Sequence, residues 1–327
     1  MRFLITGAAG FIGMHAAQRL LRDGHDVVGL DAFTPYYDPT LKRARFALLT
    51  QYPRFAGCEA SLEDAPGLRR LVQEAAPDVV IHLAAQAGVR YSIDEPGAYI
   101  GANIVGTFNL LEAVRAHPAK HLLIASTSSV YGANSAPFRE TDRADHPLSI
   151  YAATKKATED MAHSYAHLFN QPMTLMRFFT VYGPWGRPDM ALFRFTKSIL
   201  AGEAIDVYNA GRMSRDFTYV DDVVEAIARL VSCAPKRGDI GASPVAPCRV
   251  VNIAGGAPVW LDDYIATIES ATGRTALRRD LPMQAGDVTR TDASVELLAT
   301  LTGFTPKVRV DTGVKAFVEW YRQYYAV

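Results

Sequence analysis

Short apolar runs rich in β-branched residues alternate with amphipathic stretches over the first 180 residues. The apolar runs predict strands at residues 2–6, 27–30, 79–83, 121–125 and 173–178, with a later one at 250–253. The amphipathic stretches predict helices at residues 13–22, 68–75, 102–116 and 151–169. Strands that alternate with helices form a parallel sheet covered on both faces. The pattern therefore predicts an α/β fold with a doubly wound parallel sheet.

The pattern changes after Tyr182, where glycine and proline crowd between residues 183 and 188. Further helices are predicted at 191–201, 221–232, 261–272 and 312–325, separated by irregular segments and by a surface loop at 234–247. We expect a first domain over residues 1–180 and a second, smaller α/β substrate-binding lobe over residues 181–327. A strand near residues 249–254 is expected to return to the first domain.

The chain carries 34 basic and 34 acidic residues, so its formal net charge is zero. Nucleic-acid-binding proteins have a basic excess or stripe, which argues against that partner. The three cysteines, Cys58, Cys233 and Cys248, lack the spacing of a zinc site, and no histidine has metal-ligand spacing. The first apolar run is too short for a signal peptide, and no run is long enough to span a bilayer. We expect a cytoplasmic protein without a metal or a membrane partner.

Three glycines, Gly7, Gly10 and Gly13, follow the first predicted strand in the segment TGAAGFIG. Glycines at this place let the chain turn tightly and bring backbone N–H groups against a pyrophosphate. Alone, the spacing also suits an ordinary glycine-rich helix start. The second predicted strand, however, runs into Asp31, a carboxylate placed to accept hydrogen bonds from ribose hydroxyls and to repel a 2′-phosphate. Together the two signals predict NAD rather than NADP.

Tyr151 and Lys155 open a predicted helix and lie on one face of it, because four residues make slightly more than one turn. A tyrosine, with a free pKa of about 10, becomes an acid–base when nearby positive charge stabilises its phenolate. A lysine ammonium and a cationic nicotinamide would both do so. The Tyr-x-x-x-Lys spacing alone is common on surface helices. Here it follows the hydroxyl-rich segment 125–132 (ASTSSVYG), at the carboxyl end of a strand where ligands bind.

The glycine loop, Asp31, the hydroxyl-rich segment and the Tyr151–Lys155 pair together resemble the extended short-chain dehydrogenase/reductase family, which has the Rossmann fold. Segments 82–86 (HLAAQ) and 215–222 (RDFTYVDD) match as well, and the resemblance covers essentially the whole chain. It implies that NAD contacts a set of loop and strand-end residues: Gly7, Gly10, Phe11, Ile12, Gly13, Asp31, Leu83, Ala84, Ala85, Gln86, Asn103, Ser126, Tyr151, Lys155 and Phe178.

Within that family the chain most resembles the UDP-glucuronate 4-epimerases, through segments 31–45, 177–190 and 205–215. The resemblance implies an isomerase that oxidises C4 of the sugar and then reduces the 4-keto intermediate from the opposite face. In it, Tyr151 takes the proton of the 4-hydroxyl and Thr127 orients the oxygen at C4. Lys155 lowers the pKa of Tyr151 and holds the nicotinamide ribose. Two departures from the family pattern, Ala32 and Ser61, lie in segments expected near the adenosine.

The residues after Thr127 distinguish reactions within the family. Related 4,6-dehydratases carry an Asp-Glu pair there, and related UDP-glucuronate decarboxylases carry a glutamate directly before Val-Tyr-Gly. This chain has serines at both positions. Oxidising C4 of a uronate makes a β-keto acid, which loses CO₂ once its carboxylate twists out of the carbonyl plane. The hydroxyls expected to hold that carboxylate are those of Thr127, Ser128, Ser129 and Thr180. For any single serine, a bond to its own backbone is the simpler interpretation.

The remaining substrate contacts also follow from the resemblance. Arginines suit a diphosphate or a uronate because the planar guanidinium makes bidentate contacts with oxyanions. The residues expected around the substrate are Arg90, Arg187, Leu192, Tyr208, Arg215 and Asp287. For Arg90 and Arg187 a surface ion pair is an equally good interpretation. A phosphate-binding arginine of some relatives is Thr300 here, so the sequence leaves the diphosphate site incomplete.

Other functions stay open on the sequence alone. They are a 4-epimerase of UDP-glucose or of a UDP-N-acetylhexosamine or its uronate, a UDP-glucuronate decarboxylase, and a non-catalytic NAD-binding sensor, because a fold does not imply an activity. The presence of Tyr151, Lys155 and Thr127 disfavours the sensor. The resemblance also implies a homodimer in which the helices at 102–116 and 151–169 pair into a four-helix bundle. The expected partners are a UDP-sugar and a second copy of the chain.

Overall fold

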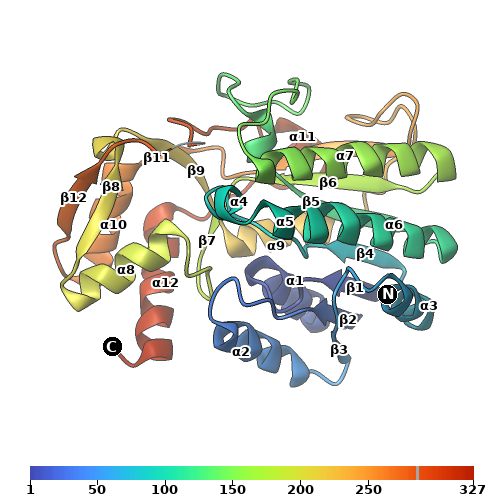
Figure 1. Ribbon diagram of the computed structural model, residues 1–327, viewed down its shortest axis with the longest axis horizontal. Coiled ribbons are helices and arrows are strands. Elements are labelled where there is room, and N and C mark those ends of the chain that lie inside the picture. The colour runs from blue at the N-terminus through green and yellow to red at the C-terminus, as the bar shows by residue number, and fades with distance from the viewer. Residues whose placement is uncertain (285–286) are drawn as a thin grey trace.

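A seven-stranded parallel sheet forms the centre of the first lobe in the computed structural model, which describes residues 1–284 and 287–327 (Figure 1). The strand order is β10-β6-β5-β4-β1-β2-β3. The strands are β1 (Arg2–Thr6), β2 (Asp26–Asp31), β3 (Phe55–Glu59), β4 (Val79–His82), β5 (His121–Thr127), β6 (Met173–Phe178) and β10 (Cys248–Ile253). From β1 the chain winds outward to β3, then places β4 on the other side of β1 and winds outward again. This order confirms the predicted doubly wound sheet.

Helices cover both faces of this sheet. One face carries α1 (Phe11–Arg22), α9 (Val220–Leu230) and α11 (Glu296–Thr302), and the other carries α3 (Ala65–Ala75), α6 (Gly106–Ala116) and α7 (Ile150–Phe169). In β1, Phe3 and Ile5 pack into the first of these layers and Leu4 packs into the second, because successive side chains point to opposite faces. All three are fully buried, which explains why the strand is a continuous apolar run rather than an alternating one.

The second lobe, on the left of Figure 1, contains two small sheets and an aromatic core. Its elements are β7 (Thr180–Tyr182), α8 (Ala191–Ala201), β8 (Ala204–Tyr208), β9 (Ser214–Tyr219), β11 (Pro258–Trp260), α10 (Leu261–Thr272), β12 (Leu277–Leu281) and α12 (Val310–Tyr325). In the core, the rings of Phe217 and Tyr264 are stacked with their centroids 4.0 Å apart. The helices lie close to their predicted positions, whereas the short strands fall in segments that the sequence pattern left irregular.

Several elements after residue 180 pack with the first lobe. Strand β10 pairs in parallel with β6, and α9 packs beside α1 on one face of the sheet. Leu298 of α11 and Phe304 belong to the same core as Phe3 and Ile5. We propose a domain boundary near residue 180, with β10, α9 and α11 returning to the first lobe. The chain therefore crosses between the two lobes several times.

The sequence pattern did not predict β3, α2 (Pro39–Thr50) or α11, nor the short helices named below. Strand β3 is an edge strand whose residues are all partly or fully exposed, so its sequence carries no buried apolar run. The predicted helix at 102–116 begins in a π-helix, Ile100–Val105, before α6. Shorter helices are α4 (Tyr91–Asp94), α5 (Pro96–Tyr99) and two 3₁₀ turns, η2 (Ser128–Tyr131) and η3 (Asn209–Gly211).

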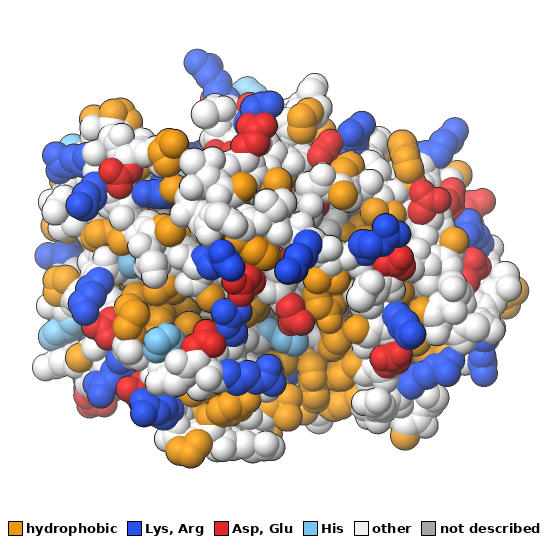
Figure 2. All heavy atoms as spheres, turned by 180° about the vertical axis from the view of Figure 1, so that it is seen from behind, with side chains coloured by type: hydrophobic (Ala, Val, Ile, Leu, Met, Phe, Trp, Pro, Cys, Tyr) orange, Lys and Arg blue, Asp and Glu red, His pale blue; other side chains and the backbone are white. Residues whose placement is uncertain are grey.

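The molecular surface has a mixed charge. On the face shown in Figure 2, basic and acidic side chains lie interspersed among apolar and uncharged groups, in keeping with the formal net charge of zero. Over the described residues, the structure contains no helix that combines the length and the apolar character needed to cross a membrane.

Candidate active site

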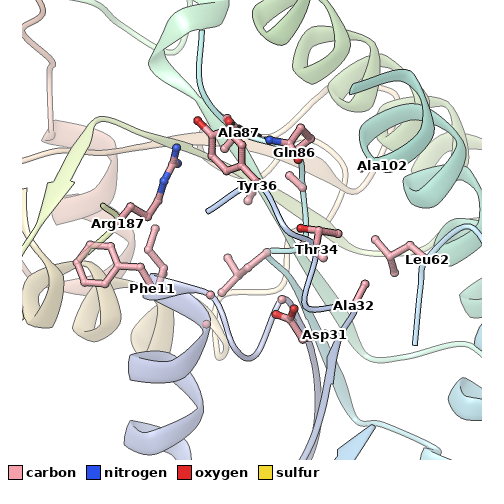
Figure 3. A pocket seen from close by; sticks show the side chains of 18 of the residues that line it. Phe11, Asp31, Ala32, Thr34, Tyr36, Leu62, Gln86, Ala87, Ala102 and Arg187 are labelled. Carbon is pink, nitrogen blue, oxygen red and sulfur yellow. Dashed lines mark hydrogen bonds between the residues drawn. The ribbon is translucent and has the colours of Figure 1, made fainter. Parts of the chain in front are cut away.

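A cavity of about 300 Å³ opens at the carboxyl ends of β1, β2, β4 and β5. This is the edge at which a doubly wound sheet binds its ligands. In Figure 3, Phe11 and Arg187 lie on one side of the cavity, and Leu62 and Ala102 lie on the other. Because Arg187 follows β7 and Phe11 opens α1, both lobes contribute to the wall.

The cavity collects nearly all of the residues predicted to contact the cofactor. Those that line it are Gly7, Gly10, Phe11, Ile12, Gly13, Asp31, Leu83, Ala84, Ala85, Gln86, Ser126, Tyr151, Lys155 and Phe178. Ala32 and Ser61, the two departures from the family pattern, line it as well. The arrangement therefore brings the glycine loop, the end of β2 and the start of α7 to one place, and the contacts of these residues with a cofactor stay a prediction.

The glycine loop is packed too tightly for side chains. A Cβ atom on Gly13 would lie 2.0 Å from the Gly7 carbonyl oxygen, and one on Gly7 would lie 2.7 Å from the Ala84 nitrogen. Gly7 also has a φ of +76°, which favours glycine. Gly10 caps α1 without a side-chain hydrogen bond, so the N–H groups of the first helical turn remain available at the cavity. An uncapped helix N-terminus beside a cavity suits the pyrophosphate of a dinucleotide.

Asp31 connects the end of β2 to the glycine loop. One carboxylate oxygen accepts a hydrogen bond from Ala9 N at 3.0 Å, and the other accepts one from Phe33 N at 2.8 Å. Asp31 is 8% exposed and lines the cavity. Each carboxylate oxygen retains a lone pair, so these bonds leave acceptor capacity for ribose hydroxyls.

Asn103 is the one predicted cofactor residue that lies behind the cavity wall. It is fully buried in the π-helix. Its side-chain oxygen accepts a hydrogen bond from Gln86 N at 2.9 Å, and its side-chain nitrogen donates one to Gln86 O at 3.0 Å. Its amide also donates to the Thr154 hydroxyl at 3.0 Å. The structure therefore places Asn103 where it fixes the backbone of Gln86, which itself lines the cavity, and connects that segment to α7.

Tyr151, Lys155 and Thr127 meet in the cavity. Ser149 caps the N-terminus of α7, and its hydroxyl accepts a hydrogen bond from Ala152 N. Tyr151 and Lys155, about one turn apart on this helix, both line the cavity. Burial raises the pKa of Tyr151 above its ordinary value, and the nearby Thr127 hydroxyl and the charge of Arg187 act in the opposite direction. Burial lowers the pKa of Lys155 to about 8, although the charge of Glu159 opposes the shift. The bare site therefore keeps Tyr151 protonated, and an added positive charge is needed to favour its phenolate.

A buried ion pair lies beneath Lys155, and sequence reasoning missed it. Arg177 of β6 donates to both carboxylate oxygens of Glu159, at 2.9 and 2.7 Å, and both side chains are about 5% exposed or less. Ser126 donates to the same carboxylate at 2.6 Å. The position of Glu159, four residues after Lys155 on one helix, was the available signal. Because Arg177 and Ser126 occupy the carboxylate, the Lys155 ammonium is left to face the cavity.

The hydroxyl cluster is only partly on the cavity wall. Thr127 lines it, whereas Ser128 and Ser129 lie on the adjoining turn η2. The Thr127 hydroxyl donates to Ser129 Oγ at 3.2 Å and accepts from Ser129 N at the same distance. Thr180 lines a smaller neighbouring cavity together with Arg187 and Leu192. Arg187 lines both cavities, so it lies between the cavity that contains Thr127 and the one that contains Thr180 and Leu192.

Arg187 carries an ion pair that the sequence left open as an alternative. Its Nε lies 3.0 Å from Asp189 Oδ1 and its Nη2 lies 2.5 Å from Oδ2, and the Tyr36 hydroxyl donates to Oδ2 at 3.0 Å. Burial would lower the pKa of Arg187, but Asp189 outweighs burial and raises it. Burial and the charge of Asp189 raise the pKa of Tyr36 to about 12. Because Asp189 binds the Arg187 guanidinium and Arg187 lines the cavity, a charged guanidinium is held at the cavity wall.

The other substrate candidates form a cluster outside the cavity. Asp287 lies 3.3 Å from Arg215 and 3.9 Å from Arg90, and the Arg90 guanidinium lies 4.8 Å from the centroid of the Tyr208 ring. Burial lowers the pKa of Arg215, and Asp287 opposes that shift. The structure thus brings these four residues together and places Thr300 on α11, and their contacts with a substrate stay a prediction. Within the described residues, no group of three or more His, Cys, Asp or Glu side chains is arranged to hold a metal ion.

Comparisons with known proteins agree with this geometry. Residues 3–241 match the NAD dependent epimerase/dehydratase family. The chain is 57% identical to a probable UDP-glucuronate 4-epimerase of Rhizobium meliloti, over 99% of this chain and 98% of that protein. It superposes with a TM-score of 0.91 on the crystal structure of a Bacillus cereus UDP-glucuronic acid 4-epimerase in complex with UDP-glucuronic acid and NAD, at 34% identity over 99% of this chain and 100% of that one. A Thermotoga maritima UDP-glucose 4-epimerase with UDP-glucose gives a TM-score of 0.86 at 30% identity, over 99% and 100% of the two chains. The chain belongs to the NAD-dependent epimerase/dehydratase family.

Proposed function

We propose that this protein interconverts UDP-glucuronate and UDP-galacturonate by inverting C4 of the sugar, with NAD as its cofactor. The observation that carries the proposal is the meeting of Tyr151, Lys155 and Thr127 in one cavity with the Arg187 guanidinium, in a chain that has serines after Thr127. The relatives support the choice of substrate, because the probable UDP-glucuronate 4-epimerase of Rhizobium meliloti shares 57% of its residues over nearly the full length.

The residues around the cavity suit NAD. The uncapped start of α1 and the close-packed glycines provide a pyrophosphate cradle, and Asp31 provides a carboxylate at the end of β2. When bound, NAD supplies the hydride acceptor for C4 of the sugar and then the hydride donor. Lys155, whose ammonium faces the cavity, would hold the nicotinamide ribose. Because the hydride is returned, the protein needs no external oxidant.

Tyr151 is the acid–base of the proposed reaction. Burial raises the pKa of the bare tyrosine, so positive charge from the nicotinamide and from the Lys155 ammonium must lower it before its oxygen accepts the proton of the 4-hydroxyl. The Thr127 hydroxyl, beside the phenol, orients the oxygen at C4. The proton returns from Tyr151 to the same oxygen once the opposite face of the 4-keto sugar has turned toward the nicotinamide.

The 4-keto intermediate is a β-keto acid and must be kept from losing CO₂. We propose that Arg187, with the hydroxyls of the Thr127–Ser129 segment and Thr180, holds the uronate carboxylate in the plane of the carbonyl. Arg187 suits this task because its guanidinium is charged, planar and held at the cavity wall by Asp189, which in turn accepts a hydrogen bond from the Tyr36 hydroxyl. The cluster of Arg90, Tyr208, Arg215 and Asp287 is proposed to bind the uridine diphosphate, with Leu192 near the uracil.

Replacing Ser129 by glutamate is expected to lower the epimerisation rate about tenfold or more, because a carboxylate beside Thr127 repels the uronate carboxylate. The comparison of Ser129→Glu with Ser129→Gln, which has the same size without the charge, isolates the electrostatic effect. Rates are measured by anion-exchange separation of the UDP-sugars. Normal epimerisation by Ser129→Glu would contradict the proposed position of the uronate.

The proposed function is tested by incubating the purified protein with UDP-glucuronate without added NAD and separating the products. UDP-galacturonate is the expected product, and it would also demonstrate that NAD stays bound through purification. UDP-xylose or a UDP-4-keto-pentose would instead indicate a decarboxylase. If neither forms even when NAD is supplied, the neutral UDP-hexoses become the substrates to try, and inactivity with those would favour an NAD-binding sensor.

We propose, further, that the protein is a cytoplasmic homodimer. Exposed apolar side chains gather on the two helices expected to pair, with Phe108 of α6 46% exposed and Leu168 of α7 68% exposed. Such side chains mark a surface suited to contact with another protein. The three cysteines are free, which suits a reducing compartment. Sedimentation analysis should give about twice the chain mass of 35.7 kDa.

A further inference from the structure

Arg45, on α2, is fully buried, with 0% of its surface exposed. All five N–H groups of its guanidinium have an acceptor. Nε and one Nη2 hydrogen are donated to Trp185 O, at 3.0 and 2.6 Å. The others go to Gly186 O at 3.0 Å, to Ala9 O at 3.3 Å and to the Tyr37 hydroxyl at 2.6 Å. Every N–H of the guanidinium thus donates a hydrogen bond to a carbonyl or hydroxyl oxygen, and none donates to a carboxylate.

The acceptors belong to two functional segments that are far apart in the sequence. Ala9 lies in the glycine loop, whereas Trp185 and Gly186 form the turn directly before Arg187. A second residue of the first lobe reaches the same turn, because His15 of α1 lies 3.0 Å from the Pro184 carbonyl oxygen. Three consecutive carbonyls of residues 184–186 are therefore bound by side chains of the first lobe.

The turn needs such external support. Trp185 has a φ of +63°, in the left-handed region that bulky residues rarely adopt, and persists there only when its surroundings fix it. Its ring packs against Trp320 and Tyr324 of α12, with centroids 5.2 and 5.0 Å away. The second lobe thus holds the Trp185 ring, while Arg45 holds the Trp185 carbonyl from the first lobe.

A buried charge is an expensive way to fill space, since apolar residues of similar volume serve stability as well or better. The arginine is explained by its contacts, because its guanidinium donates hydrogen bonds to both the turn at residues 184–186 and the glycine loop. We propose that Arg45 is a positioning residue that fixes the turn at residues 184–186 to the glycine loop, and so sets the place of the Arg187 guanidinium relative to the cofactor and the sugar. This inference rests on the proposed function, in which Arg187 restrains the uronate carboxylate.

The consequence appears in the outcome of each turnover. After C4 has given its hydride to NAD⁺ and its hydroxyl proton to Tyr151, a carboxylate free to twist breaks its bond to C5. CO₂ leaves, the electron pair stays on the C5–C4–O enolate, and C5 takes a proton from solvent. The products are UDP-4-keto-pentose, CO₂ and reduced cofactor. Loosening the turn therefore raises decarboxylation at the expense of epimerisation, which a defect in folding alone would not do.

The test compares Arg45→Met and Arg45→Lys with the wild-type protein, each purified with its cofactor and given UDP-glucuronate. Arg43→Met is the matched control, because Arg43 lies on the same helix but is exposed and pairs with Glu59 at the surface. The readouts are UDP-galacturonate, UDP-4-keto-pentose, absorbance of the reduced nicotinamide, NAD retained per chain and the melting temperature.

Arg45→Met is expected to epimerise about tenfold more slowly or worse and to give an about tenfold larger share of UDP-4-keto-pentose. Arg45→Lys, with three donors in place of five, should fall between it and wild type. Arg43→Met should stay within about twofold of wild type. An unchanged ratio of the two products in folded Arg45→Met would overturn the inference. If that variant does not fold, the same ratio in Arg45→Lys as in wild type overturns it. A wild-type protein that makes neither product would instead reject the proposed function.

Discussion

Tyr151→Phe is expected to lower the epimerisation rate about a thousandfold or more, in the range seen when a positioned acid–base is removed. The substitution removes only the phenolic oxygen, which is the group proposed to exchange a proton with the 4-hydroxyl. The ring, the helix start at Ser149 and the cavity wall remain, so the variant should fold and should still bind NAD and UDP-glucuronate.

The matched control for this variant is Tyr165→Phe. Tyr165 lies on the same helix, and its hydroxyl donates to Glu112 at 2.7 Å, away from the cavity. Both variants lose one hydroxyl from α7, but only one should lose activity. The measurement is the rate of UDP-galacturonate formation together with NAD content and substrate affinity. A Tyr151→Phe protein that epimerises within tenfold of wild type would show that another group moves the proton.

Lys155→Met should lower the epimerisation rate about a hundredfold and at the same time make the protein more stable. Lys155 is 2% exposed, and burial lowers its pKa from 10.5 to about 8. Below pH 8 the folded protein therefore holds an ammonium in an unfavourable place, at a cost on the order of 3 kcal/mol. Methionine has a similar volume and no charge, so it removes both the cost and the proposed contact with the cofactor.

The sign of the pH dependence follows from the same shift. Between pH 8 and 10.5 the unfolded chain holds a proton on Lys155 that the folded chain has lost, so this group makes the wild-type protein more stable as the pH rises. Below pH 8 both states hold the proton and the contribution is constant. The free energy of unfolding is measured for wild type and Lys155→Met at pH 7 and at pH 9.5. The difference between the two proteins should be smaller at pH 9.5. Lys156→Met, which changes the neighbouring lysine paired with Asp160, is the control. Equal stability of Lys155→Met and wild type at pH 7 would argue against the shift.

The buried strands and the cofactor end of the site follow closely from the sequence. Strand β4 was predicted at 79–83 and is observed at Val79–His82, because an apolar run covered on both faces carries its own signal. Gly7, Gly13, Asp31 and Tyr151 could be placed at this cavity in the same way, since each lies at the start or the end of a recognisable element. Edge strand β3 was not found, because its residues are partly exposed and its sequence has neither an apolar run nor clean alternation.

The parts of the site that the sequence did not predict depend on contacts between distant segments. Asp189 binds Arg187 and Tyr36, and the last two are separated by about 150 residues. Arg45 contacts a turn about 140 residues further along the chain. Nothing in either local sequence names the partner, because the contact arises only when the two lobes pack. The burial of the Arg177–Glu159 pair likewise depends on β6 lying beneath α7, which periodicity alone does not specify.

The short turn η2 has a consequence for how enzymes on this scaffold diverge. It presents Ser128 and Ser129 beside Thr127, whereas the cofactor cradle and the Tyr151–Lys155 pair belong to α1 and α7. On the proposed mechanism, substitutions in these two positions would alter the surroundings of the intermediate, and neither position belongs to α1 or α7. Under that mechanism, natural selection could redirect the fate of a common 4-keto intermediate through a few codons, while the helices that carry the cofactor cradle and the Tyr151–Lys155 pair are kept. A change of product among related enzymes would therefore require little new structure.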